Sequence, residues 1–170
     1  MCATRFDNAI VTDMMEDAIE FCAKKKGLKD RKQTLEAIRR GDCSICEYLC
    51  YSLAKGIAEY LGSVDDTVKT VYTYEPEYAT STDVAISSRS SSGINLIVWV
   101  SRKSAALSSV IASVRSALAK EYKQIVCSEA NAPCYDVDVK VVDDDEVQRR
   151  AGYGALINSL YVRPIEIWQR

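Results

Sequence analysis

Residues 94–100 place the strongest constraint on how this chain of 170 residues can fold. Their sequence, INLIVWV, is almost continuously apolar, as expected of a central β-strand that is covered on both faces. A strand of this kind must lie between two packed layers. The segment therefore predicts a β-sheet with other elements packed against it.

The residues that follow extend this strand into a β-α-β unit. Apolar side chains recur at spacings of three and four between Leu107 and Ile125, which indicates an amphipathic helix over residues 103–125. Apolar and polar residues then alternate over residues 135–142, which is typical of a half-buried strand. Because such crossovers are right-handed, the helix is expected to place this strand parallel to residues 94–100.

Two further strands are expected, one on either side of this unit. Residues 68–74 alternate and are rich in β-branched and aromatic side chains, so they are expected to pair with the central strand as an antiparallel hairpin. The Ser- and Thr-rich residues 79–93 predict a loop that holds a short strand at residues 84–86. Residues 160–168 predict a terminal strand, in which Pro164 marks an edge or a bulge.

The first third of the chain predicts three helices joined by short turns. They are expected over residues 8–25, 30–40 and 42–61, with Asn8, Asp30 and Asp42 as their N-caps. Gly62 is expected to end the third helix, because glycine commonly follows the last helical residue. Short connections leave little choice of partner, so the three helices should pack as neighbours.

These elements predict one α+β domain that spans residues 1–170. A helical N-terminal third, residues 1–62, is expected to pack with a small mixed β-sheet and one long amphipathic helix in residues 66–170. Along the chain the sheet part has the order β-β-α-β, followed by the C-terminal strand. The acidic run at residues 143–146 is expected to open a short helix, because carboxylates are favourable at a helix N-terminus.

The composition excludes several kinds of chemistry. The chain has no histidine, so Ser-His-Asp and Cys-His nucleophile pairs and histidine-ligated zinc are impossible within it. No apolar run is long enough for a transmembrane helix, and Asp7 lies where a signal peptide needs an apolar centre. We therefore expect a cytoplasmic protein that does not bind membranes, with its seven cysteines as thiols.

Cys43, Cys46 and Cys50 form a cluster that begins with the C-x2-C spacing of metal and redox sites. On a helix they project within a stripe of about 100°, together with Leu53, Ile57, Tyr60 and Val64. This stripe favours cysteines that serve as buried apolar filler. A metal or redox site at Cys43 and Cys46 is an alternative, because helix N-terminal amides lower the pKa of a thiol placed at Cys43.

The segment between Lys24 and Arg40 carries eight bases against two acids. Its basic patch consists of Lys24, Lys25, Lys26, Lys29, Arg31 and Lys32. Such a patch could follow a phosphate backbone, so weak nucleic-acid binding is a second alternative. A nucleic-acid partner is not expected, however, because the segment lacks interleaved aromatic residues and the net charge of the chain is −2.

Ten tyrosines against two phenylalanines favour surfaces that are apolar at one end and wet at the other. The predicted interaction surface consists of Tyr48, Tyr51, Tyr72, Tyr74 and Tyr78. Together with the lack of any complete catalytic set, this bias favours a non-catalytic binding or assembly protein over an enzyme. Its expected partner is another protein or, in a homodimer, a second copy of the chain, and no cofactor is predicted.

Overall fold

The structure is a computed structural model that describes residues 7–75, 93–126, 136–161 and 163–170. Its helices are α1 (Asn8–Lys26), α2 (Arg31–Arg39), α3 (Cys43–Val64), α5 (Ala105–Ile125), α6 (Asp144–Arg149) and α7 (Gly154–Ile157). Its strands are β1 (Val68–Thr73), β2 (Ile94–Val100), β3 (Val137–Asp143) and β4 (Ile165–Gln169). The predicted short strand at residues 84–86 lies outside the described residues. Within the described part, no helix combines the length and the apolar composition of a membrane span.

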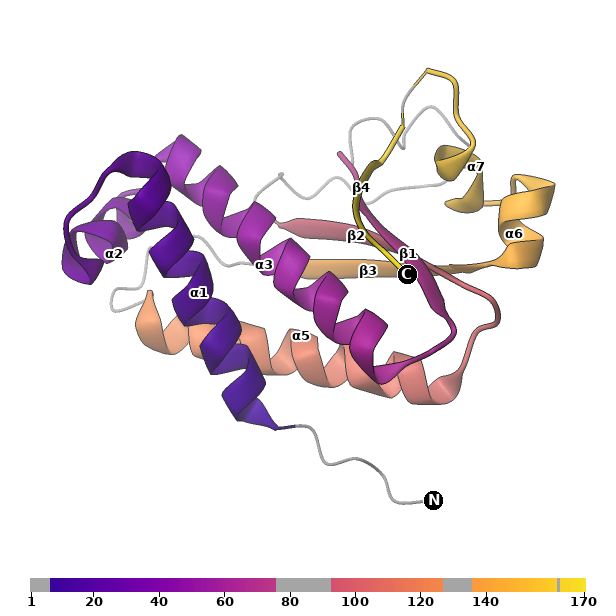
Figure 1. Ribbon diagram of the computed structural model, residues 1–170, viewed down its shortest axis with the longest axis horizontal. Helices are drawn as coiled ribbons and strands as arrows, with labels where there is room; N and C mark the ends of the chain where they lie inside the picture. Colours follow the sequence, from indigo (N-terminus) through magenta and orange to yellow (C-terminus); the bar gives the residue numbers. More distant parts are fainter. Residues whose placement is uncertain (1–6, 76–92, 127–135, 162) are drawn as a thin grey trace.

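The four described strands form one mixed sheet in the order β3-β2-β1-β4 (Figure 1). β1 pairs antiparallel with both β2 and β4, while β2 pairs parallel with β3. The predicted hairpin and the predicted parallel crossover are thus both confirmed, and with the helical N-terminal part they make an α+β fold. β4 lies at an edge of the sheet and follows directly after Pro164, which cannot donate a ladder hydrogen bond.

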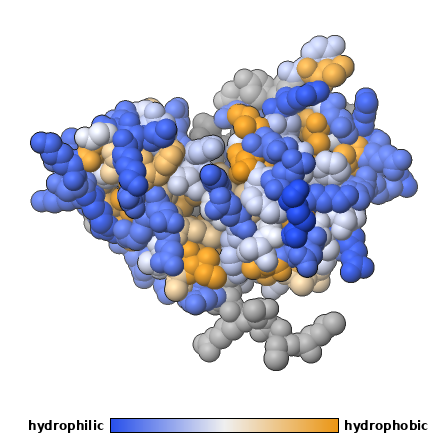
Figure 2. Space-filling model, viewed as in Figure 1, coloured by the Kyte–Doolittle hydropathy of each residue, from blue (hydrophilic) through white to orange (hydrophobic). Residues whose placement is uncertain are grey.

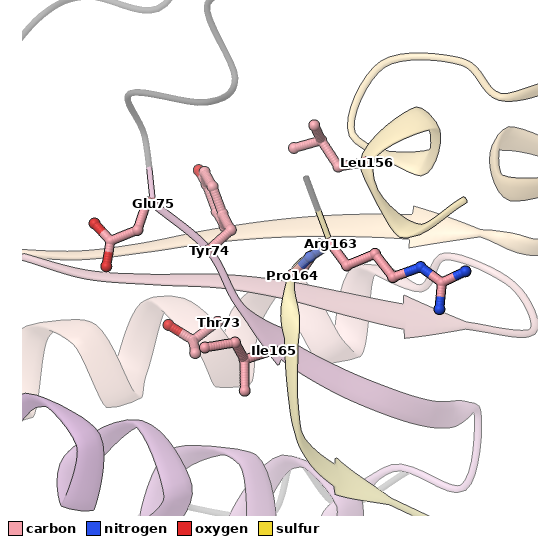
Figure 3. Close-up of a pocket in the computed structure, with 7 residues that line it drawn as sticks. All are labelled: Thr73, Tyr74, Glu75, Leu156, Arg163, Pro164 and Ile165. Carbon is pink, nitrogen blue, oxygen red and sulfur yellow. The ribbon is translucent and has the colours of Figure 1, made fainter. Parts of the chain in front are cut away.

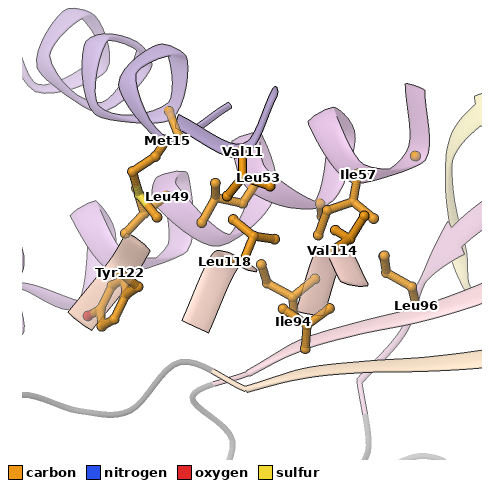
Figure 4. Packing of buried hydrophobic residues seen from close by; sticks show 14 of the residues in the cluster. Val11, Met15, Leu49, Leu53, Ile57, Ile94, Leu96, Val114, Leu118 and Tyr122 are labelled. Atoms are coloured by element: carbon orange, nitrogen blue, oxygen red, sulfur yellow. The ribbon is translucent and has the colours of Figure 1, made fainter. Parts of the chain in front are cut away.

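Helices α1, α3 and α5 cover one face of the sheet (Figure 1). Figure 4 shows side chains of α3 and α5 meeting those of β2, while α1 packs across both helices. This core includes Val11 and Met15 of α1, Leu49, Leu53 and Ile57 of α3, and Val114, Leu118 and Tyr122 of α5. Removing apolar surface from water in this way is the main stabilising contribution to folding, at roughly 25 cal/mol per Å².

The opposite face of the sheet is covered by α6 and α7 (Figure 1). The buried residues of this smaller apolar cluster are Tyr74, Ile97, Val142, Val147 and Leu156. Ile97 of β2 points into it, whereas its neighbours Leu96 and Val98 belong to the helical core. The central strand is therefore buried on both faces, as predicted.

Two of the predicted helix ends are wrong. Asp7, and not Asn8, is the N-cap of α1, and its carboxylate accepts a backbone N–H of the first turn at 3.0 Å. α3 continues through Gly62 to a C-cap at Asp65. Gly62 remains helical because it is buried against Trp168 of β4, where a larger side chain would not fit.

The acidic run opens a short helix, α6, as predicted. Asp143 accepts the backbone N–H of Glu146 at 2.9 Å, and Glu146 accepts that of Asp143 at 3.0 Å, which is a capping box. The next carboxylate, Asp144, pairs with Lys69 at 2.7 Å and accepts the indole N–H of Trp99 at 2.8 Å. These carboxylates therefore stabilise a helix end and a surface contact between α6 and the sheet.

Candidate functional site

The loop between α7 and β4 is fixed by hydrogen bonds to the short helices before it. The backbone N–H of Ser159 donates to the oxygen of Leu156 at 3.0 Å, and the side-chain amide of Asn158 donates to the oxygen of Val147 at 3.0 Å. The backbone N–H of Tyr161 then donates to the hydroxyl of Ser159 at 3.3 Å. These bonds hold Asn158 and Ser159 against α6 and α7.

A cavity of about 130 Å³ lies between this loop, the end of β1 and the start of β4 (Figure 3). It is lined by Thr73, Tyr74, Glu75, Leu156, Arg163, Pro164 and Ile165. The ladder between β1 and β4 ends at the pair of Thr73 and Ile165, and Pro164 cannot extend it because proline has no backbone N–H. The cavity therefore lies where the two strands stop pairing.

Large apolar side chains are exposed on this loop and at the start of β4. The exposed fraction is 84% for Leu160, 95% for Tyr161 and 67% for Ile165. Among the described residues, the other exposed large apolar side chains are Tyr51 and Val64 of α3, at 48% and 46%. Figure 2 shows hydrophobic surface at the tip of the loop that joins α7 to β4. We call the cavity and the side chains of Leu160, Tyr161 and Ile165 the α7–β4 corner.

Two charged side chains lie on opposite sides of the cavity (Figure 3). Glu75 follows the end of β1, and Arg163 precedes Pro164. The Nε of Arg163 donates to the backbone oxygen of Ser159 at 3.3 Å. Figure 3 shows the guanidinium of Arg163 and the carboxylate of Glu75 directed away from the cavity, in opposite directions. Within the described part of the chain, neither Glu75 nor Arg163 has an ion-pair partner. A ligand that extends beyond the cavity on both sides would therefore approach a carboxylate at one end and a guanidinium at the other.

Tyr74 forms a wall of the cavity and belongs to a polar group on the same face of the sheet. Its ring centroid lies 5.6 Å from that of Tyr153. Lys140 pairs with Asp138 at 3.1 Å and lies over the Tyr153 ring. Burial is the main cause that raises the pKa of Tyr74 far above its usual range. Tyr74 therefore stays protonated at neutral pH and does not act as a general base.

The tyrosines predicted to form an interaction surface lie in two separate places. Tyr48 and Tyr51 are on α3, where each ring centroid lies 6.1 Å from that of a phenylalanine of α1. Tyr72 is on β1 and Tyr74 directly follows this strand, both beneath α6 and α7, and Tyr74 is buried. Tyr78 lies outside the described residues. Of the four that are described, Tyr51 is the one with an exposed side chain.

The cysteines of α3 are less buried than predicted. Cys43 is exposed, and Cys46 and Cys50 are partly exposed, so the expectation of buried filler is wrong for Cys43. The buried face of α3 is formed mainly by Ile45, Leu49, Leu53, Ile57 and Leu61. The cysteines lie beside this face and not at its centre.

The pKa values of two of the described thiols, Cys22 and Cys46, are raised. Burial raises the pKa of Cys22 to about 12, and the neighbouring thiols of Cys46 and Cys50 add to this effect. Burial also raises the pKa of Cys46, to which Cys43 contributes. A raised pKa lowers the fraction of thiolate, which is the reactive form.

The metal hypothesis for Cys43 and Cys46 stays a prediction. In the part of the chain that the structure describes, no group of three or more potential ligand side chains is placed to hold a metal ion. Three further cysteines, Cys2, Cys127 and Cys134, lie outside that part.

Ion pairs compensate half of the predicted basic patch. Lys24 pairs with Glu20 at 2.7 Å, Lys26 with Asp42 at 3.7 Å, and Arg31 with Glu16 at 2.6 Å. Lys25 lies over the ring of a phenylalanine in α1, at 5.4 Å from its centroid. These contacts reduce the positive field that a nucleic acid would meet, which leaves Lys29 and Lys32 as the other members of the patch.

The residues of the α7–β4 corner were missed because residues 160–168 were expected to form one strand. The strand begins at Ile165, so Leu160 and Tyr161 have no sheet neighbour to cover them. Pro164 was the available signal. A proline ends the ladder, which leaves the apolar side chains before it outside the sheet.

The α7–β4 corner combines an apolar-walled cavity, exposed apolar side chains and two charges without a described ion-pair partner. These are features of a surface that binds other molecules. Comparison of the chain with models of protein families, with curated proteins and with solved structures found no match.

Proposed function

We propose that this chain is a non-catalytic binding protein and that the α7–β4 corner is its binding site for another polypeptide. The observation that carries the proposal is the exposure of Leu160 and Tyr161 on the loop before β4, together with that of Ile165, which lines the cavity. Exposed apolar patches of this kind mark sites of protein interaction, and side chains that fill pockets contribute most of the binding energy. A cytoplasmic location remains an expectation from the sequence.

Four carboxylates near helix N-termini have structural roles, which agrees with the proposed non-catalytic role. Asp42 and Asp143 accept backbone N–H groups as helix caps, and Glu146 completes the cap of α6. Asp144 bonds to Lys69 and to the Trp99 indole. Each of these carboxylates thus has a structural partner that explains its position without chemistry.

A phage-displayed library of random twelve-residue peptides tests this proposal. The wild-type protein should enrich peptides whose affinity falls at least about tenfold when Tyr161→Ser and Ile165→Ser are combined, because two apolar contacts are lost. The matched control combines Tyr51→Ser and Val64→Ser, which remove exposed apolar side chains from α3. It should leave the affinity unchanged, and circular dichroism verifies that both variants are folded.

Failure to enrich any peptide over the Tyr161→Ser/Ile165→Ser variant would overturn the proposal. Equal affinity for both double variants would overturn it as well. The partner can also be a second copy of the chain. In that case sedimentation velocity shows a concentration-dependent dimer for the wild type, and the corner variant remains a monomer.

A further inference from the structure

The size of the cavity in the α7–β4 corner limits what can enter it. Its volume is about 130 Å³. An engineered apolar cavity of roughly 150 Å³ in another protein holds one benzene molecule. The cavity therefore has room for one aliphatic or aromatic side chain of a partner, and the rest of the partner must lie outside it.

The walls of the cavity favour an apolar anchor. Leu156, Pro164 and Ile165 contribute apolar side chains to the lining, and Tyr74 contributes an aromatic one. Burying an apolar side chain against such walls is favourable, whereas a buried polar group without a partner is costly.

The rim of the cavity adds a requirement for charge. Arg163 and Glu75 lie on opposite sides of the cavity in Figure 3, without ion-pair partners among the described residues. The hydrogen bond from Arg163 to the Ser159 oxygen uses its Nε, so the two terminal nitrogens can donate to a carboxylate. Glu75 can accept from an ammonium group. Charge complementarity therefore favours an extended partner whose two charges lie on either side of its anchor.

We propose that the α7–β4 corner recognises a peptide segment that inserts one leucine-like or phenylalanine-like side chain into the cavity, places an acidic group on Arg163 and directs a basic group toward Glu75. This inference rests on the proposed function and specifies the partner's chemistry.

Synthetic seven-residue peptides test the inference directly. Each carries a fluorescent label and a central leucine, with an aspartate two residues to one side and a lysine two residues to the other, in either order. One order should bind, and replacing its leucine by alanine or its aspartate by asparagine should weaken binding about tenfold each. Fluorescence anisotropy gives the dissociation constants.

The pairing of charges is tested with variants of the protein. Arg163→Gln should weaken binding of the aspartate peptide about tenfold, and should make it insensitive to the change of aspartate to asparagine. Arg102→Gln is the matched control, because Arg102 is an exposed arginine outside the corner. This control substitution should leave the dissociation constants of the aspartate peptide and of the asparagine peptide unchanged.

The outcomes separate this inference from the proposed function. Binding could be weakened by replacing the peptide leucine, Tyr161 or Ile165, and yet be unchanged when the peptide aspartate or Arg163 is replaced. This result would overturn the charge requirement and leave the polypeptide-binding proposal standing. Absence of binding by either peptide order overturns the inference, and the library selection then decides on the proposed function. Binding that is equally weak in Arg163→Gln and Arg102→Gln would also overturn it.

Discussion

Gly62 shows how one residue sets the distance between two elements. It lies in the last turns of α3, and the indole of Trp168 from β4 packs directly against its Cα. A Cβ built at Gly62 would overlap the Cζ2 and Cη2 atoms of that ring. Glycine inside a helix costs about 1 kcal/mol relative to alanine. The close packing of Trp168 offsets this cost, which is why the helix does not end where the sequence pattern predicts.

Alanine substitutions at Gly62 and Gly56 of α3 distinguish two effects on stability: the close packing of Trp168 against the helix and the low helix propensity of glycine. Gly62→Ala should lower the free energy of unfolding by about 1–3 kcal/mol, because overpacking forces Trp168 and β4 to move. Gly56→Ala meets only the flexible Met14 side chain, whose Cγ is 3.2 Å from the added Cβ. It should leave stability unchanged or raise it by up to about 1 kcal/mol. Urea denaturation measures both, and equal effects would contradict this account.

At the scale of elements, the sequence predicts best where burial is complete or strictly periodic. β2 is recognisable because its run is apolar except for Asn95, and α5 because its buried residues recur at spacings of three and four. The parallel pairing of β2 with β3 then follows from the handedness of the crossover. For this part of the chain, local pattern and tertiary packing agree.

The predicted face of α3 is wrong at the helix ends for a geometric reason. Its buried residues from Ile45 to Leu61 recur every four positions, and four residues rotate by about 400°. The buried stripe therefore drifts around the helix by about 40° at each step. The predicted stripe runs parallel to the helix axis, so it coincides with the buried residues only in the middle of α3, at Leu53 and Ile57. At the two ends it predicts burial of Cys43 and Val64, which are exposed.

The candidate site is less predictable from the sequence than the fold, because it depends on the residue at which β4 stops pairing with β1. The bulge within β4 and the end of its ladder at Ile165 are set by contacts with β1, which is distant in sequence. Exposure of Leu160 and Tyr161 follows from that end and not from their own residue types. Their apolar character predicted a strand, which is the commoner use of such residues.

Arg39 joins α2 to the C-terminus of α5, and its removal is a test of that contact. Its Nε and Nη2 donate to the backbone oxygens of Val126 and Ile125 at 3.0 and 2.9 Å, where the helix leaves carbonyl groups unpaired. Arg39→Gln should lower the free energy of unfolding by about 1 kcal/mol. Arg40→Gln removes an exposed pair with Glu36 and should change it by less than about 0.5 kcal/mol. Thermal and urea unfolding measure both, and a larger effect of Arg40→Gln would contradict the proposed cap.

At the scale of the whole molecule, the described residues cover the two faces of the sheet very unequally. The helical core unites residues from α1, α2, α3, α5 and three strands, as well as side chains of β4 packed at its border. The other face is covered by α6 and α7, which have six and four residues, through a cluster with five buried side chains. Regions with little buried apolar surface open at a lower free energy than the core. We therefore expect α6 and α7 to open locally at a lower free energy than the helices of the large core.

Native-state hydrogen exchange should reveal this difference. Amides of α6 and α7 should open at roughly half or less of the free energy of global unfolding, while those of β2 exchange only by global unfolding. Val147→Ala, which truncates a buried side chain under α6, should speed exchange in α6 and α7 much more than in α3. Equal opening free energies for α7 and β2 would show that both faces unfold together. Because Leu156 of α7 lines the cavity, a peptide that fills it should slow exchange in α7 while leaving the helical core unchanged.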